Sequence, residues 1–304
     1  MPARLRTRTL AFALLSLAAM SPAQADERRT LQHQGVARDV IVINAPAAGA
    51  PPRPVLIALH GRREPDAAHR SSPQLDALAR KEGFVAVYPS ALQGQWNHAG
   101  RTGSLSKAGS EPADDIGFMG RLIDWLVAEK IADPARVHVS GTSAGGFMTY
   151  SILCLLSDKI AAAAPFLASM TEAQMTPCKP VRVVPMMVIA GTDDRVVPYD
   201  GQLTKSGRLT SVPETLEFWR RLMGCTGQHS AAMPHREPGD PTRTLIVDWS
   251  GCRQGTALRL YRVEGGGHIL PALTPASAEQ RWGRRNRDFE TSVETWEFFK
   301  SQAR

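Results

Sequence analysis

The sequence predicts a single-domain α/β fold, built on a doubly wound, mostly parallel sheet with helices on both faces. Short Val/Ile-rich segments alternate with helix-like segments for most of the 304 residues, which implies parallel strands joined by helical crossovers. Several of these segments are continuously apolar rather than alternating, as expected for strands that are covered on both faces. One of them leads into a glycine-rich turn at residues 141–146, and a helix-like segment follows this turn.

Each predicted strand is rich in Val or Ile and ends near Gly, Pro or Asn. We expect strands at residues 40–44, 55–60, 84–88, 137–140, 186–190 and 258–263, and helices at 73–82, 116–129, 147–156, 214–223 and 289–298. The Pro/Ala-rich segment 46–54 is expected to be a hairpin-like connection. Two long polar stretches, 93–113 and 225–255, are expected to be loops near residue 143, because long loops in a compact domain are commonly functional.

The first 25 residues have the three parts of a secretory signal peptide. Arginines at positions 4, 6 and 8 are followed by an apolar stretch from Leu10 to Met20 and by the small-residue site Ala23-Gln24-Ala25. The apolar stretch is too short to span a bilayer. We therefore expect residues 1–25 to be removed and the mature domain, 26–304, to be secreted or periplasmic. The alternative is a disordered tail.

The charge of the mature chain is mild. The formal charge of +7 falls by three to +4 when the signal-peptide arginines are removed, since that segment holds no acidic residue. The densest basic run, residues 281–287, precedes the last predicted helix and is expected to be a solvated face. The sequence has no Cys/His finger pattern and no Gly-rich phosphate loop followed by lysine. Neither nucleic acid nor, after signal cleavage, a membrane is an expected partner.

The mature chain has four cysteines, an even number that indicates disulfides in a chain expected to be exported. They are Cys154, Cys178, Cys225 and Cys252. Three connectivities are possible, and pairing of sequence neighbours, 154 with 178 and 225 with 252, requires the least chain rearrangement. The alternative is four free buried thiols. The cysteine spacing matches no zinc site, so we expect no metal.

The glycine-rich turn reads Gly-Thr-Ser-Ala-Gly-Gly, with Ser143 as its serine. A Gly-x-Ser-x-Gly pentapeptide between a strand and a helix is typical of the nucleophile elbow of α/β-hydrolases, which exposes the serine hydroxyl above the sheet. Side chains at positions 141 and 145 would collide with neighbouring elements, which accounts for the glycines. The pentapeptide alone is a weak signal, and its strand–helix context makes it specific. The sequence therefore predicts the α/β-hydrolase fold with Ser143 as the nucleophile.

A serine hydroxyl is a poor nucleophile at neutral pH, so it needs a base, and the base needs an orienting acid. In α/β-hydrolases both follow the serine along the chain, with the acid first. Asp193 and Asp194 directly follow the buried strand predicted at 186–190, where the acid is expected. Spacing alone does not separate the two aspartates, and at least one of them caps the turn before Val196.

His268 is the expected base. It follows the strand predicted at 258–263 and three consecutive glycines, which allow a close-packed loop. His229 and His235 are alternatives, but they lie in a polar stretch with no predicted strand to position them. His138 precedes the serine and lies within a strand, where a buried structural histidine is expected.

The oxyanion that forms during acyl transfer needs backbone N–H donors. The amide of Ala144, directly after the nucleophile, is expected to be one of them. We expect the Arg62 amide to be the second, because the strand predicted at 55–60 ends in His60 and Gly61 just before it. The Arg62 side chain then places a basic group beside the site, with a solvated loop residue as the alternative. His60 is expected to hold this loop by hydrogen bonding.

Several short motifs occur together in one order over most of the mature chain. They are Leu59-His60-Gly61, residues 83–89 with Trp96-Asn97, residues 114–118, residues 141–146, residues 191–194 with Val197-Pro198-Tyr199, Gly224-Cys225, Gly251-Cys252 and residues 264–268. On these motifs, the chain resembles the secreted esterases that group poly(3-hydroxybutyrate) depolymerases with feruloyl and acetylxylan esterases. The agreement of many motifs in order is far more specific than any one of them.

The resemblance implies that Asp194 is the catalytic acid, through the family's Gly-Thr-x-Asp-x-x-Val-Pro pattern, and it supports the 225–252 disulfide. The chain departs from the family after His268, where a tryptophan followed by Pro-Gly is common and residues 269–272 read Ile-Leu-Pro-Ala. This departure bears on how an aryl or sugar ring is held. Trp96 is a candidate for lining the acyl or alcohol pocket, and a packed loop tryptophan is the alternative.

The resemblance and the three candidate catalytic residues together predict a secreted serine esterase that forms an acyl-enzyme and needs no cofactor. Its expected substrates are 3-hydroxybutyrate oligomers or hydroxycinnamoyl and acetyl sugar esters. Soluble oligomers or small esters are favoured over solid polymer, because the sequence shows no binding module and no aromatic platform. The alternatives are a serine peptidase of the prolyl-oligopeptidase type, which usually carries a large extra domain, and a non-catalytic carbohydrate-binding protein, which would not need to keep all three residues.

Overall fold

The computed structural model describes residues 26–62, 73–98, 113–204, 207–274 and 279–304, so the predicted signal peptide lies outside the described residues. The strands are β1 (Glu27–His33), β2 (Val36–Ile43), β3 (Arg53–Leu59), β4 (Val85–Pro89), β5 (Ala132–Thr142), β6 (Ala162–Phe166), β7 (Met186–Gly191), β8 (Gln202–Thr204), β9 (Gly207–Leu209), β10 (Gly227–Ala232), β11 (Arg243–Ser250) and β12 (Leu258–Glu264). The helices are α1 (Pro73–Glu82), α2 (Asp115–Ala128), α3 (Ala144–Leu155), α4 (Glu172–Met175), α5 (Val212–Met223), α6 (Glu279–Trp282) and α7 (Thr291–Phe299).

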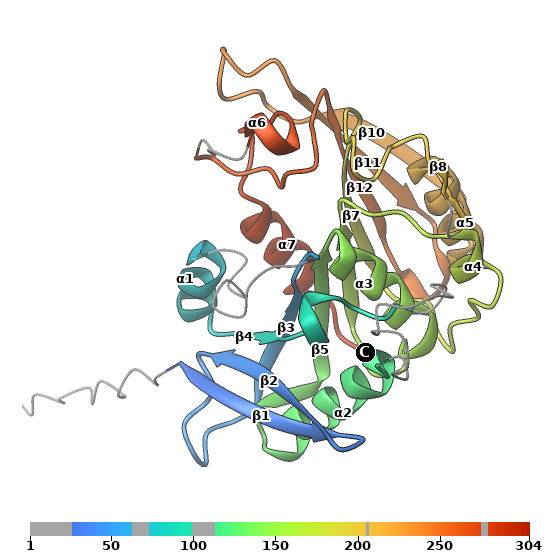
Figure 1. Cartoon of the computed structure of the whole chain (residues 1–304). Helices are drawn as coiled ribbons and strands as arrows, with labels where there is room; N and C mark the ends of the chain where they lie inside the picture. Colours follow the sequence, from blue (N-terminus) through green and yellow to red (C-terminus); the bar gives the residue numbers. More distant parts are fainter. Residues whose placement is uncertain (1–25, 63–72, 99–112, 205–206, 275–278) are drawn as a thin grey trace, which may run out of the picture.

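A sheet of ten of the described strands forms the centre of the molecule, in the order β1-β2-β4-β3-β5-β6-β7-β12-β11-β10 (Figure 1). The strands from β4 to β12 in this order run parallel, and an antiparallel pair of strands extends the sheet at each edge. The predicted doubly wound, mostly parallel sheet is therefore confirmed. Parallel strands place all their carboxyl ends on one edge, which is where ligand sites form in such sheets.

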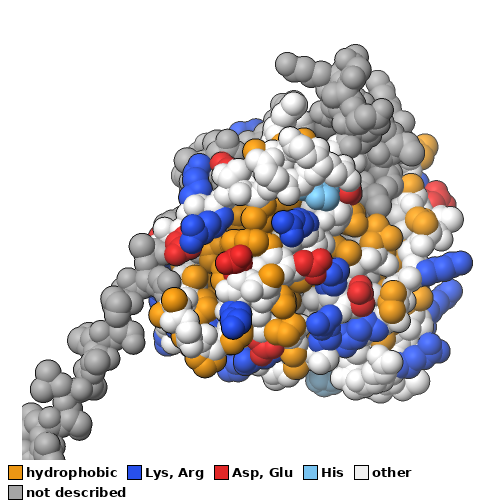
Figure 2. All heavy atoms as spheres, turned by 90° about the horizontal axis from the view of Figure 1, so that it is seen from below, with side chains coloured by type: hydrophobic (Ala, Val, Ile, Leu, Met, Phe, Trp, Pro, Cys, Tyr) orange, Lys and Arg blue, Asp and Glu red, His pale blue; other side chains and the backbone are white. Residues whose placement is uncertain are grey.

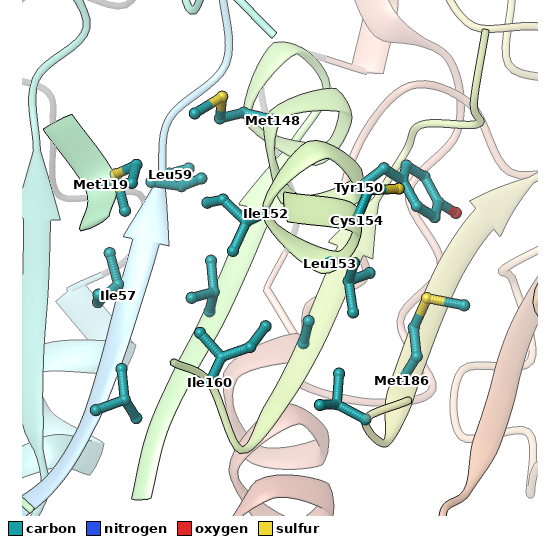
Figure 3. Packing of buried hydrophobic residues seen from close by; sticks show 14 of the residues in the cluster. Ile57, Leu59, Met119, Met148, Tyr150, Ile152, Leu153, Cys154, Ile160 and Met186 are labelled. Atoms are coloured by element: carbon teal, nitrogen blue, oxygen red, sulfur yellow. The ribbon is translucent and has the colours of Figure 1, made fainter. Parts of the chain in front are cut away.

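The central strands direct alternate side chains into two hydrophobic layers. Ile57 and Leu59 of β3 pack in the layer that contains α2, α3 and α5, whereas Leu56 and Ala58 pack in the layer with α1 and α7. Figure 3 shows the first of these layers, where Ile152 projects from α3 towards the sheet. A strand buried on both faces has a continuously apolar sequence, which is why the sequence reveals these strands clearly.

Most predicted elements are confirmed within a few residues. The predicted strands correspond to the end of β2 and to β3, β4, β5, β7 and β12, and the predicted helices correspond to α1, α2, α3, α5 and α7. The sequence patterns do not reveal β6, whose sequence Ala-Ala-Ala-Pro-Phe lacks the β-branched residues that favour strands. This strand is nevertheless fully buried between β5 and β7. Its strand conformation therefore depends on the neighbouring strands and not on the strand propensity of its own residues.

Two predicted connections are wrong. Residues 225–255 do not form a loop near residue 143, because they contain β10 and β11, which extend the sheet beyond β12. β10 is mostly exposed and polar, so it lacks the apolar alternation by which a strand is recognised. Residues 46–54 do not close a hairpin, since β4 lies between β2 and β3 in the sheet. The hairpin at this edge joins β1 to β2 through Gln34 and Gly35, whose φ values of 48° and 76° suit a two-residue turn.

Charges of both signs are interspersed on the face of the molecule seen in Figure 2, with hydrophobic side chains between them. A mixed surface of this kind produces no extended field of one sign on that face. The basic run 281–287 is only partly the solvated face that we expect from the sequence. Arg281 and Arg284 are exposed, whereas Arg287 is half-buried and pairs with Glu279 at 3.0 Å. Among the described residues, no helix has the length and apolar character needed to cross a bilayer.

Candidate active site

Ser143 lies in the turn between β5 and α3, and its backbone has a φ of 56° and a ψ of −115°. A positive φ is uncommon for a residue with a side chain and is a form of local strain that is often found at functional sites. The Ser143 N–H donates to the carbonyl oxygen of Phe166 at 2.9 Å, which ties the turn to β6. A Cβ on Gly141 would lie 2.2 Å from the carbonyl oxygen of Gly145, and one on Gly145 would lie 2.3 Å from that of Leu59. Both positions therefore require glycine, as predicted.

Ser143, His268 and Asp194 form a continuous hydrogen-bonded chain. Ser143 Oγ lies 2.9 Å from His268 Nε2, and His268 Nδ1 lies 2.6 Å from Asp194 Oδ2. The side chains of His268 and Asp194 are only 8% and 2% exposed, so their contact is shielded from water. A ring nitrogen that faces a carboxylate donates a hydrogen to it, which leaves Nε2 of the neutral ring to accept the Ser143 hydroxyl.

Asp194 is fixed by the turn that follows β7. Its Oδ1 accepts the backbone N–H groups of Val196 and Val197, each at 2.8 Å, so Oδ2 remains for His268. Asp193 is exposed, and its carboxylate lies 3.5 Å from the Thr192 hydroxyl. Of the two aspartates that spacing leaves open, the structure thus brings Asp194 to the histidine.

The loop that carries His268 is held through its backbone. The N–H of His268 donates to the carbonyl oxygen of Trp282 at 2.6 Å, and the N–H of Gly267 donates to that of Arg284 at 2.9 Å. The segment that includes α6 and the start of the basic run therefore positions His268. Sequence reasoning does not find this role, because backbone carbonyls, which every residue type has, perform it.

The other candidate histidines lie away from Ser143. His229 is exposed on the edge strand β10, and His235 Nδ1 lies 2.9 Å from the buried carboxylate of Asp288. His138 is fully buried on β5, with its ring stacked 4.9 Å from that of Phe299. Within the part of the chain that the structure describes, no group of three or more His, Cys, Asp or Glu side chains is placed to hold a metal ion.

The two expected oxyanion donors are amides of residues that line one cavity together with Ser143. Ala144 is the first residue of α3, so its N–H is one of those that a helix leaves without an intrahelical acceptor. Arg62 follows β3 and lines the same cavity as Ser143 and Ala144. His60 holds the loop before Arg62: its Nδ1 donates to the carbonyl oxygen of Gly61 at 2.6 Å, and its Nε2 accepts the N–H of Ala91 at 3.0 Å. The expectation that His60 anchors this loop agrees with these contacts.

A cavity of about 330 Å³ opens at Ser143. Its apolar lining includes Trp96, Phe147, Val196, Val197 and Leu209, and its polar lining includes Arg62, Gln95, His98, Thr171, Gln202 and Thr204. Trp96 is only 1% exposed and also lines this cavity, so it is both a packed tryptophan and part of the cavity wall. The described start of the predicted loop 93–113 therefore lies near Ser143, and residues 99–112 lie outside the described residues.

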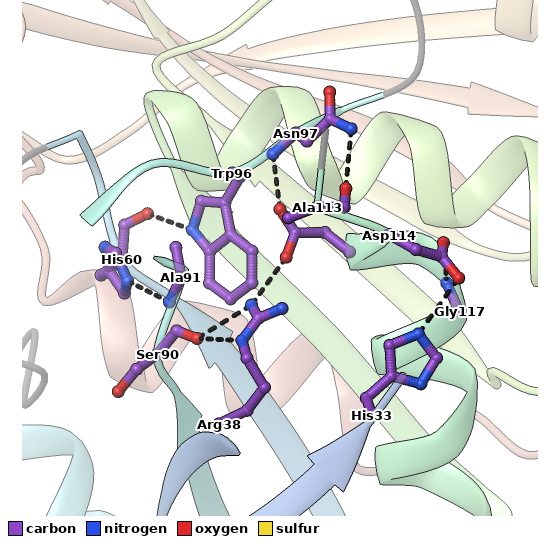
Figure 4. Close-up of polar contacts among 11 residues, drawn as sticks. His33, Arg38, His60, Ser90, Ala91, Trp96, Asn97, Ala113, Asp114 and Gly117 are labelled. Carbon is purple, nitrogen blue, oxygen red and sulfur yellow. Dashed lines mark hydrogen bonds and ion pairs between the residues drawn. The ribbon is translucent and has the colours of Figure 1, made fainter. Parts of the chain in front are cut away.

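A buried ion pair lies beneath this cavity wall (Figure 4). Arg38 Nη2 lies 2.6 Å from Asp115 Oδ1, and the two side chains are 2% and 0% exposed. Arg38 also donates to the carbonyl oxygen of Ser90, from Nη2 at 3.0 Å and from Nε at 3.2 Å. The second Asp115 oxygen accepts the backbone N–H of Asn97 at 2.5 Å. The pair thus fixes both ends of the segment that runs from β4 to the cavity wall.

Asp114 and Asp115 begin α2 and have different tasks. Asp114 accepts the N–H of Gly117 at 2.8 Å and so caps the helix, while His33 lies 3.1 Å from its other oxygen. Burial raises the pKa of Asp114, but the hydrogen bonds from Gly117 and His33 more than offset this and hold the pKa below its usual value. The sequence motif at 114–118 draws attention to both aspartates. It does not reveal Arg38, the partner of Asp115, which lies 77 positions earlier in the chain.

The cysteines form the two nearest-neighbour disulfides, Cys154–Cys178 and Cys225–Cys252, with Cα–Cα distances of 5.0 and 3.8 Å. The first joins the end of α3 to the segment after α4, and the second joins the end of α5 to the segment after β11. No cysteine in the described ranges is free. Disulfides of this kind persist in oxidising compartments.

Several known enzymes are similar to this chain in sequence. A bifunctional acetylxylan esterase/xylanase of Neocallimastix patriciarum is 30% identical over 254 residues, which cover 82% of this chain and 32% of that protein. Feruloyl esterase B of Piromyces equi is 28% identical over 222 residues, which cover 71% of this chain and 39% of that protein. Poly(3-hydroxyalkanoate) depolymerase C of Paucimonas lemoignei is 33% identical over 118 residues, which cover 37% of this chain and 27% of that protein. The chain is homologous to these enzymes. The resemblance expected from the motifs is therefore confirmed.

The solved structure of acetyl xylan esterase from Aspergillus awamori matches this one with a TM-score of 0.60 at 16% sequence identity, covering 91% of this chain and 99% of that chain. The protein has the α/β-hydrolase fold, as predicted. No protein-family model matches the chain. The matched part of the chain spans only 32% and 39% of the length of the first two curated relatives, which are thus much longer proteins.

Proposed function

We propose that the protein is an exported serine esterase in which Ser143 is the nucleophile, His268 the base and Asp194 the orienting acid. The observation that carries this proposal is the hydrogen-bonded chain from Ser143 Oγ through His268 to Asp194, at the mouth of a cavity. Homology to enzymes that hydrolyse carboxylic esters supports a carboxylic ester as the bond that this protein cleaves. No cofactor takes part in the proposed reaction.

In the first step, Ser143 Oγ attacks the ester carbonyl carbon while its proton passes to Nε2 of His268. Asp194 stabilises the imidazolium that forms and keeps Nδ1 protonated, and the two amides at its Oδ1 keep its other oxygen aimed at the ring. The strained turn at Ser143 holds the hydroxyl at the start of α3, above the ends of the parallel strands.

The negative charge that develops on the carbonyl oxygen is held by the amides of Ala144 and Arg62. The positive end of the α3 dipole favours the same charge. When the tetrahedral intermediate collapses, His268 gives its proton to the leaving alcohol oxygen, and an acyl-enzyme remains on Ser143. Water, activated by the same histidine, then releases the carboxylic acid and restores the hydroxyl.

The volume of the cavity limits the size of the substrate. A volume of about 330 Å³ is at the small end of the range for ligand sites and suits a small ester or a short oligomer. We propose 3-hydroxybutyrate oligomers or hydroxycinnamoyl and acetyl sugar esters as substrates, in line with the enzymes to which the chain is homologous. Export is supported by the signal-peptide pattern of residues 1–25 and by the two disulfides.

The test compares initial rates of the parent and Ser143→Ala proteins on one panel: p-nitrophenyl acetate and butyrate, methyl ferulate, acetylated xylan and 3-hydroxybutyrate oligomers. We expect the variant to lose on the order of 10⁴- to 10⁶-fold in kcat, as removal of a triad nucleophile does, while its thermal unfolding stays close to that of the parent. A Ser143→Ala protein as active as the parent would overturn the proposal.

The role of the acid can be tested with two matched substitutions, one at the proposed catalytic residue Asp194 and one at its neighbour Asp193. Asp194→Asn should lower kcat by about 10³- to 10⁴-fold, because the amide favours the wrong histidine tautomer. Asp193→Asn, at the exposed neighbour, should remain close to the parent. Equal effects of the two substitutions would contradict the role of Asp194.

A further inference from the structure

Arg62 brings into the cavity a positive charge that the proposed hydrolysis does not itself need, because the expected oxyanion donor is its backbone amide. Among the described residues that line the cavity, Arg62 is the one with a permanently charged side chain, and none is Asp or Glu. The residue is exposed, and no described ion pair of the chain includes it. Its charge therefore has no internal partner among the residues that the structure describes.

Two carboxylates close to the cavity wall are already engaged. Asp194 is held by two amides and by His268, and it does not line the cavity. Glu172, which follows the lining residue Thr171, lies 3.8 Å from Arg208, and the same arginine lies 2.9 Å from Glu214. Arg62 is therefore the one arginine among the described residues that line the cavity, and it has no acidic partner in the described part of the chain.

The position of Arg62 along the chain limits which groups of a bound ester its side chain can contact. Its backbone follows β3 and the anchored residues His60 and Gly61, and it lines the cavity together with Ser143. An arginine whose amide holds the oxyanion starts next to the scissile carbonyl, so its guanidinium reaches groups a few bonds away in the bound ester. The planar guanidinium pairs best with a carboxylate, to which it donates two parallel hydrogen bonds.

We propose that Arg62 is a specificity determinant that selects esters carrying a free carboxylate a few bonds from the scissile ester. This proposal rests on the proposed function and names the substrate class of the same site. The carboxylate takes no part in the bond changes: it pairs with the guanidinium while Ser143 attacks the ester carbonyl. It belongs either to the acyl part, as in a monoester of a dicarboxylic acid, or to the alcohol part, as in an acylated hydroxy acid.

Gln95 supports a polar substrate independently of charge. This residue lines the cavity, and its side-chain oxygen is buried without a hydrogen-bond donor among the described residues. A buried acceptor left without a donor costs free energy, which a hydroxyl group of a bound ligand would recover once the Gln95 amide turns towards the cavity. An ester that carries a carboxylate and a hydroxyl fits this wall better than a purely apolar one.

The test uses two matched substrate pairs at a pH where carboxylates are ionised. The acyl-side pair is monomethyl and dimethyl glutarate, followed by methanol release, and the alcohol-side pair is 3-butyryloxypropanoate and its methyl ester, followed by butyrate release. For each pair, the ratio of kcat/KM for the anionic to the neutral ester is measured in one protein. Any change in the oxyanion site affects both members of a pair and cancels in this ratio.

We expect the parent to favour the anionic member of one pair by about tenfold, as one charge-assisted contact at a partly exposed site provides. The pair that shows the preference tells which side of the ester carries the carboxylate. Arg62→Gln should abolish the preference, and Arg62→Lys should retain part of it. Added salt should weaken it in the parent, because the contact is solvent-accessible. Arg208→Gln, which removes an arginine already paired with Glu214, is the control and should keep it.

Two results would overturn the inference while the proposed function stands: a parent that hydrolyses the neutral esters but shows no preference in either pair, or an Arg62→Gln protein that keeps the preference. If the parent hydrolyses no member of either pair and a fluorophosphonate probe fails to label Ser143, the proposed function and this inference are both overturned.

Discussion

The indole N–H of Trp96 donates to the carbonyl oxygen of His60 at 3.0 Å, and this bond joins the cavity wall to the loop that leads to Arg62. The two rings also lie against each other, with their centroids 5.1 Å apart. On its far side the His60 ring accepts the N–H of Ala91, so the loop is tied twice to the segment that follows β4. A carbonyl fixed in this way limits the rotation of the peptides after it. We therefore expect Trp96 to act on the proposed oxyanion donor as well as on the shape of the cavity.

Trp96→Phe tests this relationship, because phenylalanine keeps an aromatic ring in the wall and loses only the N–H donor. We expect kcat on p-nitrophenyl butyrate to fall about fivefold with a smaller change in KM, as the loss of one hydrogen bond of about 1 kcal/mol in the transition state implies. Trp249→Phe, in the half-buried part of β11, is the control. A raised KM with an unchanged kcat would show instead that Trp96 only contacts the substrate.

The local part of the site can be predicted from the sequence. The turn at Ser143 and its glycines form one short motif, and the strand before His268 marks that residue among its rivals. Asp194 and Asp193 differ in the direction of their side chains within one turn, which spacing does not encode. The catalytic acid is therefore assigned to Asp194 by the resemblance to known esterases and, in the structure, by the amides of Val196 and Val197 that hold its carboxylate.

The supporting contacts cannot be predicted in this way, because they join distant parts of the chain. Arg38 and Asp115 are 77 residues apart, and nothing in the sequence around Arg38 distinguishes it from a surface arginine of β2. The edge strand β10 is likewise difficult to predict from the sequence. β10 is polar and mostly exposed, and it is held by hydrogen bonds to β11 rather than by burial of its own side chains.

Asp115→Asn should both destabilise the fold and slow the reaction. The substitution leaves the Arg38 charge buried without its counter-ion, which costs about 3–5 kcal/mol in the free energy of unfolding. It also weakens the acceptor for the N–H of Asn97, so the cavity wall that includes Trp96 is less firmly held. Denaturant unfolding and kcat on one neutral ester measure the two effects.

The double variant Arg38→Met with Asp115→Leu separates stability from positioning. Replacing a buried ion pair by apolar side chains of similar size is often neutral for stability, so we expect the double variant to regain most of the free energy of unfolding. It does not restore an acceptor for the N–H of Asn97, so kcat should stay several-fold below that of the parent. Recovery of the parent kcat in the double variant would show that the pair serves stability alone.

His138 should make the folded state sensitive to acid. Burial, reinforced by the nearby charge of Arg136, lowers the pKa of this histidine to about 3, and neither ring nitrogen has a hydrogen-bond partner among the described residues. The unfolded chain protonates the same ring near its ordinary pKa of about 6.5. Between these two values the unfolded state binds one proton more than the folded state, so this histidine lowers the free energy of unfolding as the pH falls, by up to about 1.4 kcal/mol per pH unit.

His138→Leu removes the titrating group and keeps an apolar side chain in the layer with Phe299. We expect the variant to lose less stability than the parent as the pH is lowered from about 6.5 towards 4, the window in which only the unfolded chain protonates this ring. Above that window the ring is neutral in both states, so the two stability curves should run parallel there, whatever the offset that the new packing causes. Free energies of unfolding from denaturant titrations at several pH values give both curves. Curves that stay parallel through the acid range would mean that the His138 ring protonates in the folded protein as readily as in the unfolded chain.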